Sequence, residues 1–271
     1  MKFMVGTSHS PSQVWLFIRH GPVYPAVVSP PAKNAKPLAS GPGETTNPNA
    51  ANLNEVEISR ERLDGLVINV ELTLVSIIQG VTLSFLTDTT RQLMAANSLE
   101  YYPYALNGLL IIFLFWSRAV IHTFTVIRWP LEFAHNFLYI SCAFFEGISF
   151  ANLSQPVLWY GLQAIFAALV WLLLILDMRL IRAREAEFAG TQLAPLFSAI
   201  ERDQKLNILA AIPLFLIFYL VATGLLWYQQ ALGHTSRLHL WFAGAQTLGL
   251  TGYLIYLLRF YARVGPWLLR P

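Results

Sequence analysis

The chain has little charge and almost no cysteine. Asp, Glu, Lys and Arg make up 12% of its 271 residues, whereas apolar residues make up 55%. Soluble domains carry about 25% charged residues, so this composition excludes an ordinary soluble protein. The single cysteine, Cys142, excludes a disulfide within the chain and a paired-cysteine metal site. We therefore predict an all-α, multi-pass membrane protein.

The sequence also lacks the motifs that carry most enzyme chemistry. It contains no glycine-rich nucleotide loop, no catalytic-triad spacing and no zinc motif. The net charge is +3, but the basic residues are spread over short segments between apolar runs, which argues against nucleic-acid binding. Asp177, near Arg179 and Arg182, is the nearest match to a phosphate site, and the simpler interpretation is a charged flank that stops membrane transfer. We predict neither an enzyme nor a bound cofactor, metal or nucleic acid.

Residues 1–60 are predicted to form a disordered tail rich in proline, glycine and asparagine. Such a composition buries too little apolar surface to offset the entropy of the chain. The apolar stretch from Trp15 to Ile18 is too short for a secretory signal, so the first long apolar segment is expected to direct membrane insertion. Residues 61–271 are then expected to form the transmembrane domain.

Six apolar segments lie in this domain, each close to the roughly 20 residues that cross a bilayer. They cover residues 66–86, 104–127, 131–150, 157–180, 208–229 and 238–261. Arg128-Trp129-Pro130 alone separates the second from the third, which predicts an antiparallel hairpin. The longest connection, 181–206, is typical of an amphipathic charged helix.

Lys and Arg residues gather on one side of these six segments. Arg60, Arg128, Arg182 and Arg259 all fall there, and the opposite side has only Arg91 and Arg237 near the membrane. The positive-inside rule places that side, with both termini, in the cytoplasm. Four tryptophans near segment ends are predicted to anchor the chain at the membrane boundary: Trp159, Trp227, Trp241 and Trp267.

Five ionisable residues fall inside the apolar segments, where each needs a partner or a hydrated cavity. They are Glu71, Arg118, His122, His135 and Glu146. Helical spacing places Asn107, Arg118 and His122 on one face of segment 104–127. The same spacing places His135, Tyr139, Cys142, Glu146 and Ser149 on one face of segment 131–150. We expect these two faces to meet.

The rise along each helix predicts an Arg118–Glu146 ion pair within the membrane. Glu71, His122 and His135 are predicted to form a second cluster nearer the cytoplasm. Both sets have two interpretations: a transport or proton-relay site, or an ion pair that only fixes how the helices pack. A haem held by His122 and His135 is a less favoured alternative, because they form only one plausible histidine pair.

A stripe of small and polar side chains runs along the first segment. Asn69, Thr73, Ser76, Gly80 and Ser84 lie within about 60° of one another on the helix. Such a stripe is typical either of a hydrated pore wall or of close packing between helices.

The first three segments resemble the six-helix subunit of the lysosomal and bacterial non-canonical potassium channels. The similar features are Arg60 and Asp64 before a Thr73-Leu74 pair, Phe115-Trp116 followed by His122, and Asn136. The spacing before Asp64 is one residue shorter than in that family. His122 follows Trp116 by six positions, about one helical turn later than the family pattern places its histidine. The resemblance implies a tetramer in which the first helix lines a cation pore.

Three functions follow as hypotheses. The first is an oligomeric cation channel, potassium-like, with residues 69–84 lining the pore. The second is a non-catalytic subunit of a larger membrane complex that binds partners through its tail. The third is a small-solute or proton-coupled transporter with a midplane site at Arg118 and Glu146. Few and short loops favour a bacterial inner membrane, where lipid and either further copies of the chain or other subunits are the expected partners.

Overall fold

A computed structural model describes residues 48–125, 133–233 and 237–268. The chain divides into two units, residues 1–51 and 52–271, and the packing described below belongs to the second. The predicted tail up to residue 47 and the predicted 128–130 turn lie outside the described residues. Within the described ranges every regular element is helical, as the composition predicts.

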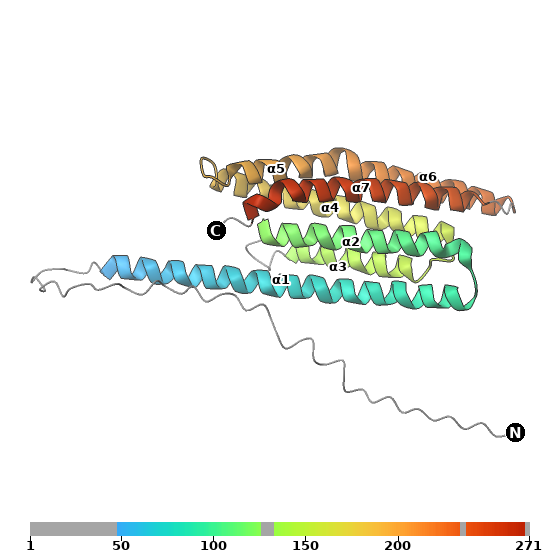
Figure 1. The fold of residues 1–271 in the computed structure, drawn as a ribbon, viewed down its shortest axis with the longest axis horizontal. Coiled ribbons are helices and arrows are strands. Elements are labelled where there is room, and N and C mark those ends of the chain that lie inside the picture. Colours follow the sequence, from blue (N-terminus) through green and yellow to red (C-terminus); the bar gives the residue numbers. More distant parts are fainter. Residues whose placement is uncertain (1–47, 126–132, 234–236, 269–271) are drawn as a thin grey trace, which may run out of the picture. The chain divides into compact units, whose positions relative to one another are not determined.

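The helices follow the apolar segments, with some different boundaries (Figure 1). They are α1 (Pro48–Ala95), α2 (Tyr102–Thr125), α3 (Phe133–Phe150), α4 (Pro156–Glu187), α5 (Ala194–Leu206), α6 (Ile212–Ala231) and α7 (Leu238–Leu268). A short 3₁₀ turn, Leu99–Tyr101, precedes α2, and a π-helical turn, Asn207–Ala211, joins α5 to α6. Helix α1 thus begins within the segment predicted to be a disordered tail.

Local sequence explains most helix ends. Pro156 opens α4, and a proline also lies at the start of α5, where its missing N–H group costs no hydrogen bond. Pro213 of α6 instead follows the π-helical turn in a continuous helix, where a proline removes one backbone hydrogen bond. Gly233 has a φ angle of +69° immediately after α6, a conformation that a residue with a Cβ atom adopts only with strain.

Four described helices are long and apolar enough to cross a membrane. They lie within residues 69–95, 99–123, 156–187 and 194–231. Large apolar side chains also point outward, for example Trp241, Leu209 and Leu248, each more than three-quarters exposed. Such a surface is unsuited to water and fits contact with lipid. The apolar helices therefore fit a membrane protein, as the sequence predicts.

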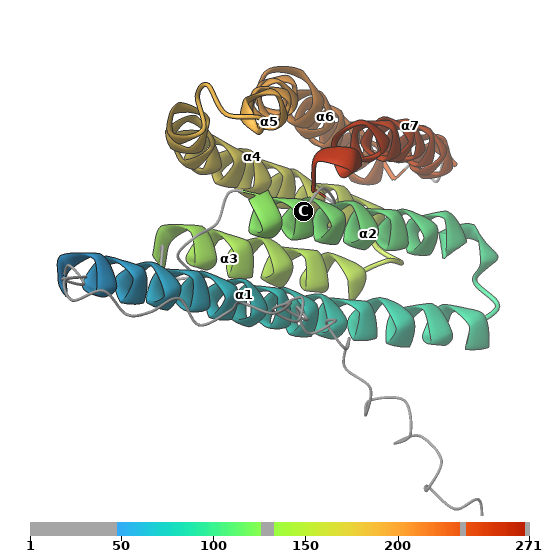
Figure 2. The same ribbon diagram turned by 60° about the vertical axis from the view of Figure 1, so that its left-hand side comes forward.

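Among the helices of residues 52–271, α4 has the most extensive packing. Helix α4 contacts α3, α5 and α6, while α2 packs against α7 (Figures 1 and 2). Helix α1 runs beside α3, where Thr82 and Phe85 approach Gly147. Aromatic side chains fill the core, including Tyr104, Phe150 and Tyr160. Trp159 belongs to this core and is fully buried, so its predicted role as a boundary anchor is wrong, whereas Trp227 and Trp241 are exposed.

Candidate functional site

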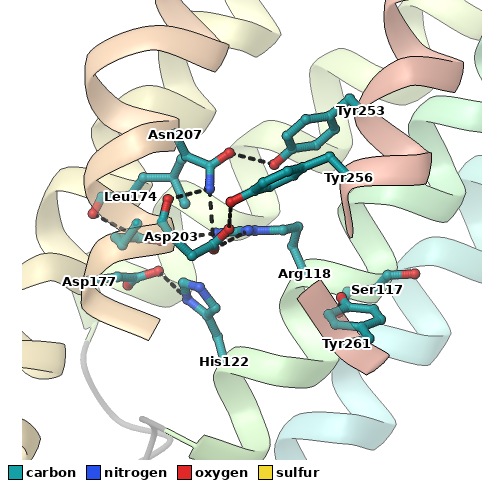
Figure 3. A network of polar contacts seen from close by, with 11 residues as sticks. Ser117, Arg118, His122, Leu174, Asp177, Asp203, Asn207, Tyr253, Tyr256 and Tyr261 are labelled. Atoms are coloured by element: carbon teal, nitrogen blue, oxygen red, sulfur yellow. Dashed lines mark hydrogen bonds and ion pairs between the residues drawn. The ribbon is translucent and has the colours of Figure 1, made fainter. Parts of the chain in front are cut away.

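Asp177 of α4 holds two histidines from two other helices. The Nδ1 atom of His122 on α2 lies 2.9 Å from one carboxylate oxygen, and Nδ1 of His135 on α3 lies 2.8 Å from the other. All three side chains are buried. We call these three residues the His–Asp–His cluster; Figure 3 shows its His122–Asp177 half. When Asp177 is ionised its carboxylate only accepts hydrogen bonds, so both rings then carry a proton on Nδ1.

A cavity of about 110 Å³ lies beside the His–Asp–His cluster. Its polar lining includes Glu71, Arg118 and Tyr139, and the remaining wall is largely apolar, with Phe115 and Phe166 among its residues. One buried water molecule requires about 10–15 Å³, so this space accommodates several waters or a small ion. The cavity therefore brings ionisable groups from α1, α2, α3 and α4 together in a low-dielectric setting.

Glu71 is the least compensated of these groups. It is only 2% exposed, and its Oε2 atom has no hydrogen-bond partner among the described residues. It lies within electrostatic range of His135. The predicted cluster of Glu71, His122 and His135 therefore shares one cavity, but Asp177 stands at its centre rather than on a charged membrane flank.

Arg118 does not pair with Glu146, so that prediction is wrong. Its guanidinium donates to Asp203 of α5 at 2.6 Å and to the Gln204 side-chain oxygen at 3.0 Å. Arg118 and Asp203 lie in the same network as Asn207 in Figure 3. The reason is topological: α5 continues into α6 and carries Asp203 into the protein interior, next to α2.

Tyrosines of α7 complete the Arg118–Asp203 network. The hydroxyl group of Tyr256 donates to Asp203 at 2.6 Å, and that of Tyr253 donates to the Asn207 side-chain oxygen at 2.6 Å. Asn207 is fully buried and opens the π-helical turn. π-Helical turns are frequent at functional sites. The junction of α5 and α6 lies next to the cavity, because Ile212 and Phe215 at the start of α6 also line it.

Glu146 lies deeper along α3, on the predicted buried face. His135, Tyr139, Cys142, Glu146 and Ser149 are all buried, which confirms that face. The Oε2 atom of Glu146 accepts a hydrogen bond from the Gln79 amide at 3.3 Å, and the same amide donates to the Tyr139 hydroxyl at 3.4 Å. Gln79 was not predicted as a site residue. It lies at helical spacing from Glu71 and Val75 on the buried face of α1, and that spacing is the signal for it.

A fourth set of buried polar contacts surrounds Gln246 of α7. Its side-chain oxygen accepts hydrogen bonds from Asn107 Nδ2 and Trp159 Nε1, both at 3.2 Å, and its amide donates to the Tyr219 hydroxyl at 3.3 Å. Asn107 also accepts a hydrogen bond from Thr247 at 2.7 Å.

The small polar stripe of α1 faces outward. Asn69, Thr73, Ser76, Gly80 and Ser84 are all exposed on the single chain. A Cβ atom added at Gly80 would meet nothing within 4 Å. The Thr73 and Ser84 hydroxyls donate to carbonyls of their own helix, which satisfies them locally. The stripe thus stays available to another molecule and takes no part in the cavity.

The described residues include no group of three or more His, Cys, Asp or Glu side chains that could hold a metal ion. The haem alternative stays a prediction, because the Nδ1 contacts of His122 and His135 with Asp177 do not involve the Nε2 atoms through which histidine binds haem iron. No protein-family model, curated protein or solved structure matches the chain.

Proposed function

We propose that this protein couples proton movement to the transport of a small cation across a membrane. The observation that carries the proposal is the cavity where Glu71 faces the His–Asp–His cluster. An ionisable residue within a membrane helix is costly and typically marks an ion or proton path. Here four ionisable residues, one from each of α1, α2, α3 and α4, line one cavity.

The charges of these four residues suit exchange. Glu71 and Asp177 supply two negative charges when ionised, and His122 and His135 each carry zero or one positive charge. The site is neutral when two protons occupy it, and each proton that leaves makes room for one monovalent cation. Arg118 does not disturb this balance, because Asp203 neutralises it at 2.6 Å.

Proton exchange is measurable in liposomes that contain the purified protein and a pH-sensitive dye. Addition of K⁺ or Na⁺ outside is expected to make the lumen more alkaline, because protons leave as cations enter. Asp177→Asn is expected to lower the rate of this pH change at least tenfold. Asp88→Asn is the matched control, since Asp88 is exposed and pairs only with its helical neighbours Arg91 and Gln92.

Two results contradict the proposal. One is cation entry without proton exit in the wild-type protein. The other is an Asp177→Asn variant that exchanges protons as fast as the Asp88→Asn control.

An oligomeric cation channel is the second candidate. The outward position of Asn69, Thr73, Ser76, Gly80 and Ser84 favours it, because a polar stripe needs cover or water within a membrane. The resemblance to six-helix potassium-channel subunits leads to the same candidate. In this proposal the stripes of several copies surround a hydrated path.

Cysteine substitution separates this candidate from simple lipid contact. The native Cys142 is fully buried, so introduced cysteines are labelled against a quiet background. In a channel, Gly80→Cys reacts with a charged, water-soluble thiol reagent and the adjacent, lipid-facing Val81→Cys does not. Equal reactivity of both positions, or of neither, counts against a pore at α1. Purification with several different proteins would instead favour the accessory-subunit alternative.

A further inference from the structure

Glu146 is a second buried carboxyl group, away from the His–Asp–His cluster. Its side chain is fully buried between α1 and α3. Within the described part of the chain, Gln79 is its hydrogen-bond donor and the Oε1 atom has no partner. An ionised carboxylate in such a place lacks both a counter-charge and enough donors, which costs several kcal/mol. The neutral acid fits these surroundings better.

The neighbouring helices present neutral groups to Glu146. Helix α1 supplies the Gln79 amide; one turn further along α3, Gln163 of α4 donates through Nε2 to Ser149 Oγ at 2.8 Å. Gln163 Oε1 is a buried acceptor without a partner among the described residues. The titratable groups that face Glu146 are Tyr139 and Cys142 of its own helix. No described neighbour therefore offers a positive charge.

A hydrogen-bonded connection leads from Glu146 to the cavity. The Gln79 amide joins the Glu146 carboxyl group to the Tyr139 hydroxyl, and Tyr139 lines the cavity together with Glu71. Glu146 lies eleven positions after His135 on α3, a rise of about 16 Å. That is about half of the hydrocarbon thickness of a bilayer.

We propose that Glu146 is a proton-binding site that carries its proton as a neutral acid and exchanges it with the cavity along the α1–α3 interface. This inference rests on the proposed function only for its role in transport. When the proton leaves, the O–H bond of Glu146 breaks, its electron pair stays on the carboxylate, and a new O–H bond forms at Glu71 or a new N–H bond at a histidine. Gln79 and Tyr139 are positioning residues for this transfer.

Infrared spectroscopy tests the protonation state directly. A protonated carboxyl group has a C=O stretch outside the amide bands, which shifts in D₂O. The wild-type protein at neutral pH is expected to show this band, and Glu146→Gln is expected to lose it. The control Glu100→Gln, at an exposed position, is expected to retain it. Identical spectra for the wild type and Glu146→Gln overturn the proposal.

Liposome flux tests the role in transport. Glu146→Gln keeps the shape of the side chain and is expected to lower proton exchange at least tenfold without lowering the melting temperature. Tyr139→Phe keeps the ring stacked on Phe115 and is expected to slow exchange while the infrared band remains.

Undiminished exchange in Glu146→Gln overturns the role of Glu146 but leaves the proposed function standing. A wild-type protein with the band but without proton exchange refutes the proposed function and keeps the proton site. If Glu146→Gln does not fold, the infrared band of Glu146→Asp is compared with that of the wild type instead. A band at the same position in both proteins overturns the proton site.

Discussion

Arg118 of α2 donates to Asp203 of α5 at 2.6 Å, across 85 positions of the sequence. Only 13% of the Arg118 side chain and 5% of the Asp203 side chain are exposed. The pair links the apolar helix α2 to the π-helical junction before α6. Tyr256 belongs to the same network, because its hydroxyl group donates to the other carboxylate oxygen of Asp203.

Removing one member of this pair is expected to destabilise the protein strongly. Arg118→Ala leaves Asp203 charged and buried, which costs about 3–5 kcal/mol in comparable cases. Thermal unfolding in detergent is the measurement, and a large drop in melting temperature is expected. Arg91→Ala, which breaks the exposed Arg91–Asp88 pair, is expected to change little. Equal drops for both variants would show that burial of the pair is not the cause.

The buried faces were predictable because helical periodicity is a local property. The spacing of His135, Tyr139, Cys142 and Glu146 suffices to place them on one side of α3. The partner of Arg118 was not predictable, because Asp203 lies between Arg202 and Lys205 in a connection that the sequence predicts to be a charged amphipathic helix outside the apolar segments. Its burial arises from the continuous passage of α5 through the π-helical turn into α6, although Pro213 at this junction is a signal for a helix break.

Asp177 is a second residue whose buried contacts the sequence did not predict. Its neighbours Arg179 and Arg182 indicate a membrane boundary, and both are exposed. One side of α4 nevertheless faces α2 and α3 at this level, so Asp177 is buried while residues two positions later are not. The number of charged residues in a segment does not distinguish the exposed side of a helix from its buried side. The contacts of Asp177 with the two histidines depend on that difference.

Gly108 of α2 is expected to resist substitution. A Cβ atom there would lie 2.8 Å from Leu86 Cδ1 and 3.1 Å from the buried Phe150 ring. Gly108→Ala is therefore expected to cost about 1–3 kcal/mol through overpacking, visible as a lower melting temperature. Gly244→Ala is the matched control, since a Cβ atom there meets nothing within 4 Å and alanine favours the helix. A Gly108→Ala protein as stable as Gly244→Ala would contradict this packing.

Gln246 is expected to be essential for the polar group on α7. Gln246→Leu removes the acceptor of Asn107 and Trp159 and the donor to Tyr219. Each buried group left without a partner costs about 1–3 kcal/mol, so this variant is expected to unfold at a distinctly lower temperature. Gln92→Leu, at an exposed position, is the control. Similar melting temperatures for the two variants would mean that water replaces the lost bonds.

The His–Asp–His cluster is expected to behave as one energetic unit. Asp177→Asn removes the charge that both imidazoles face, so it is expected to destabilise more than His122→Gln or His135→Gln alone. Once Asp177 is changed, adding His122→Gln is expected to cost little more, with a coupling energy of about 0.5–3 kcal/mol. Unfolding of the single and double variants in detergent measures this coupling.

The pair Asp177→Asn and Asp88→Asn is the additive reference for that cycle, because Asp88 is exposed and hydrogen-bonds to Arg91 and Gln92. Additive effects for Asp177 and His122 as well would mean that their 2.9 Å contact carries no energy. Strong coupling in stability with normal proton exchange in Asp177→Asn liposomes would leave the cluster as a packing element of α2, α3 and α4. Coupling together with loss of exchange ties the same three side chains to transport, since a merely structural cluster would not change the proton flux of a protein that remains folded.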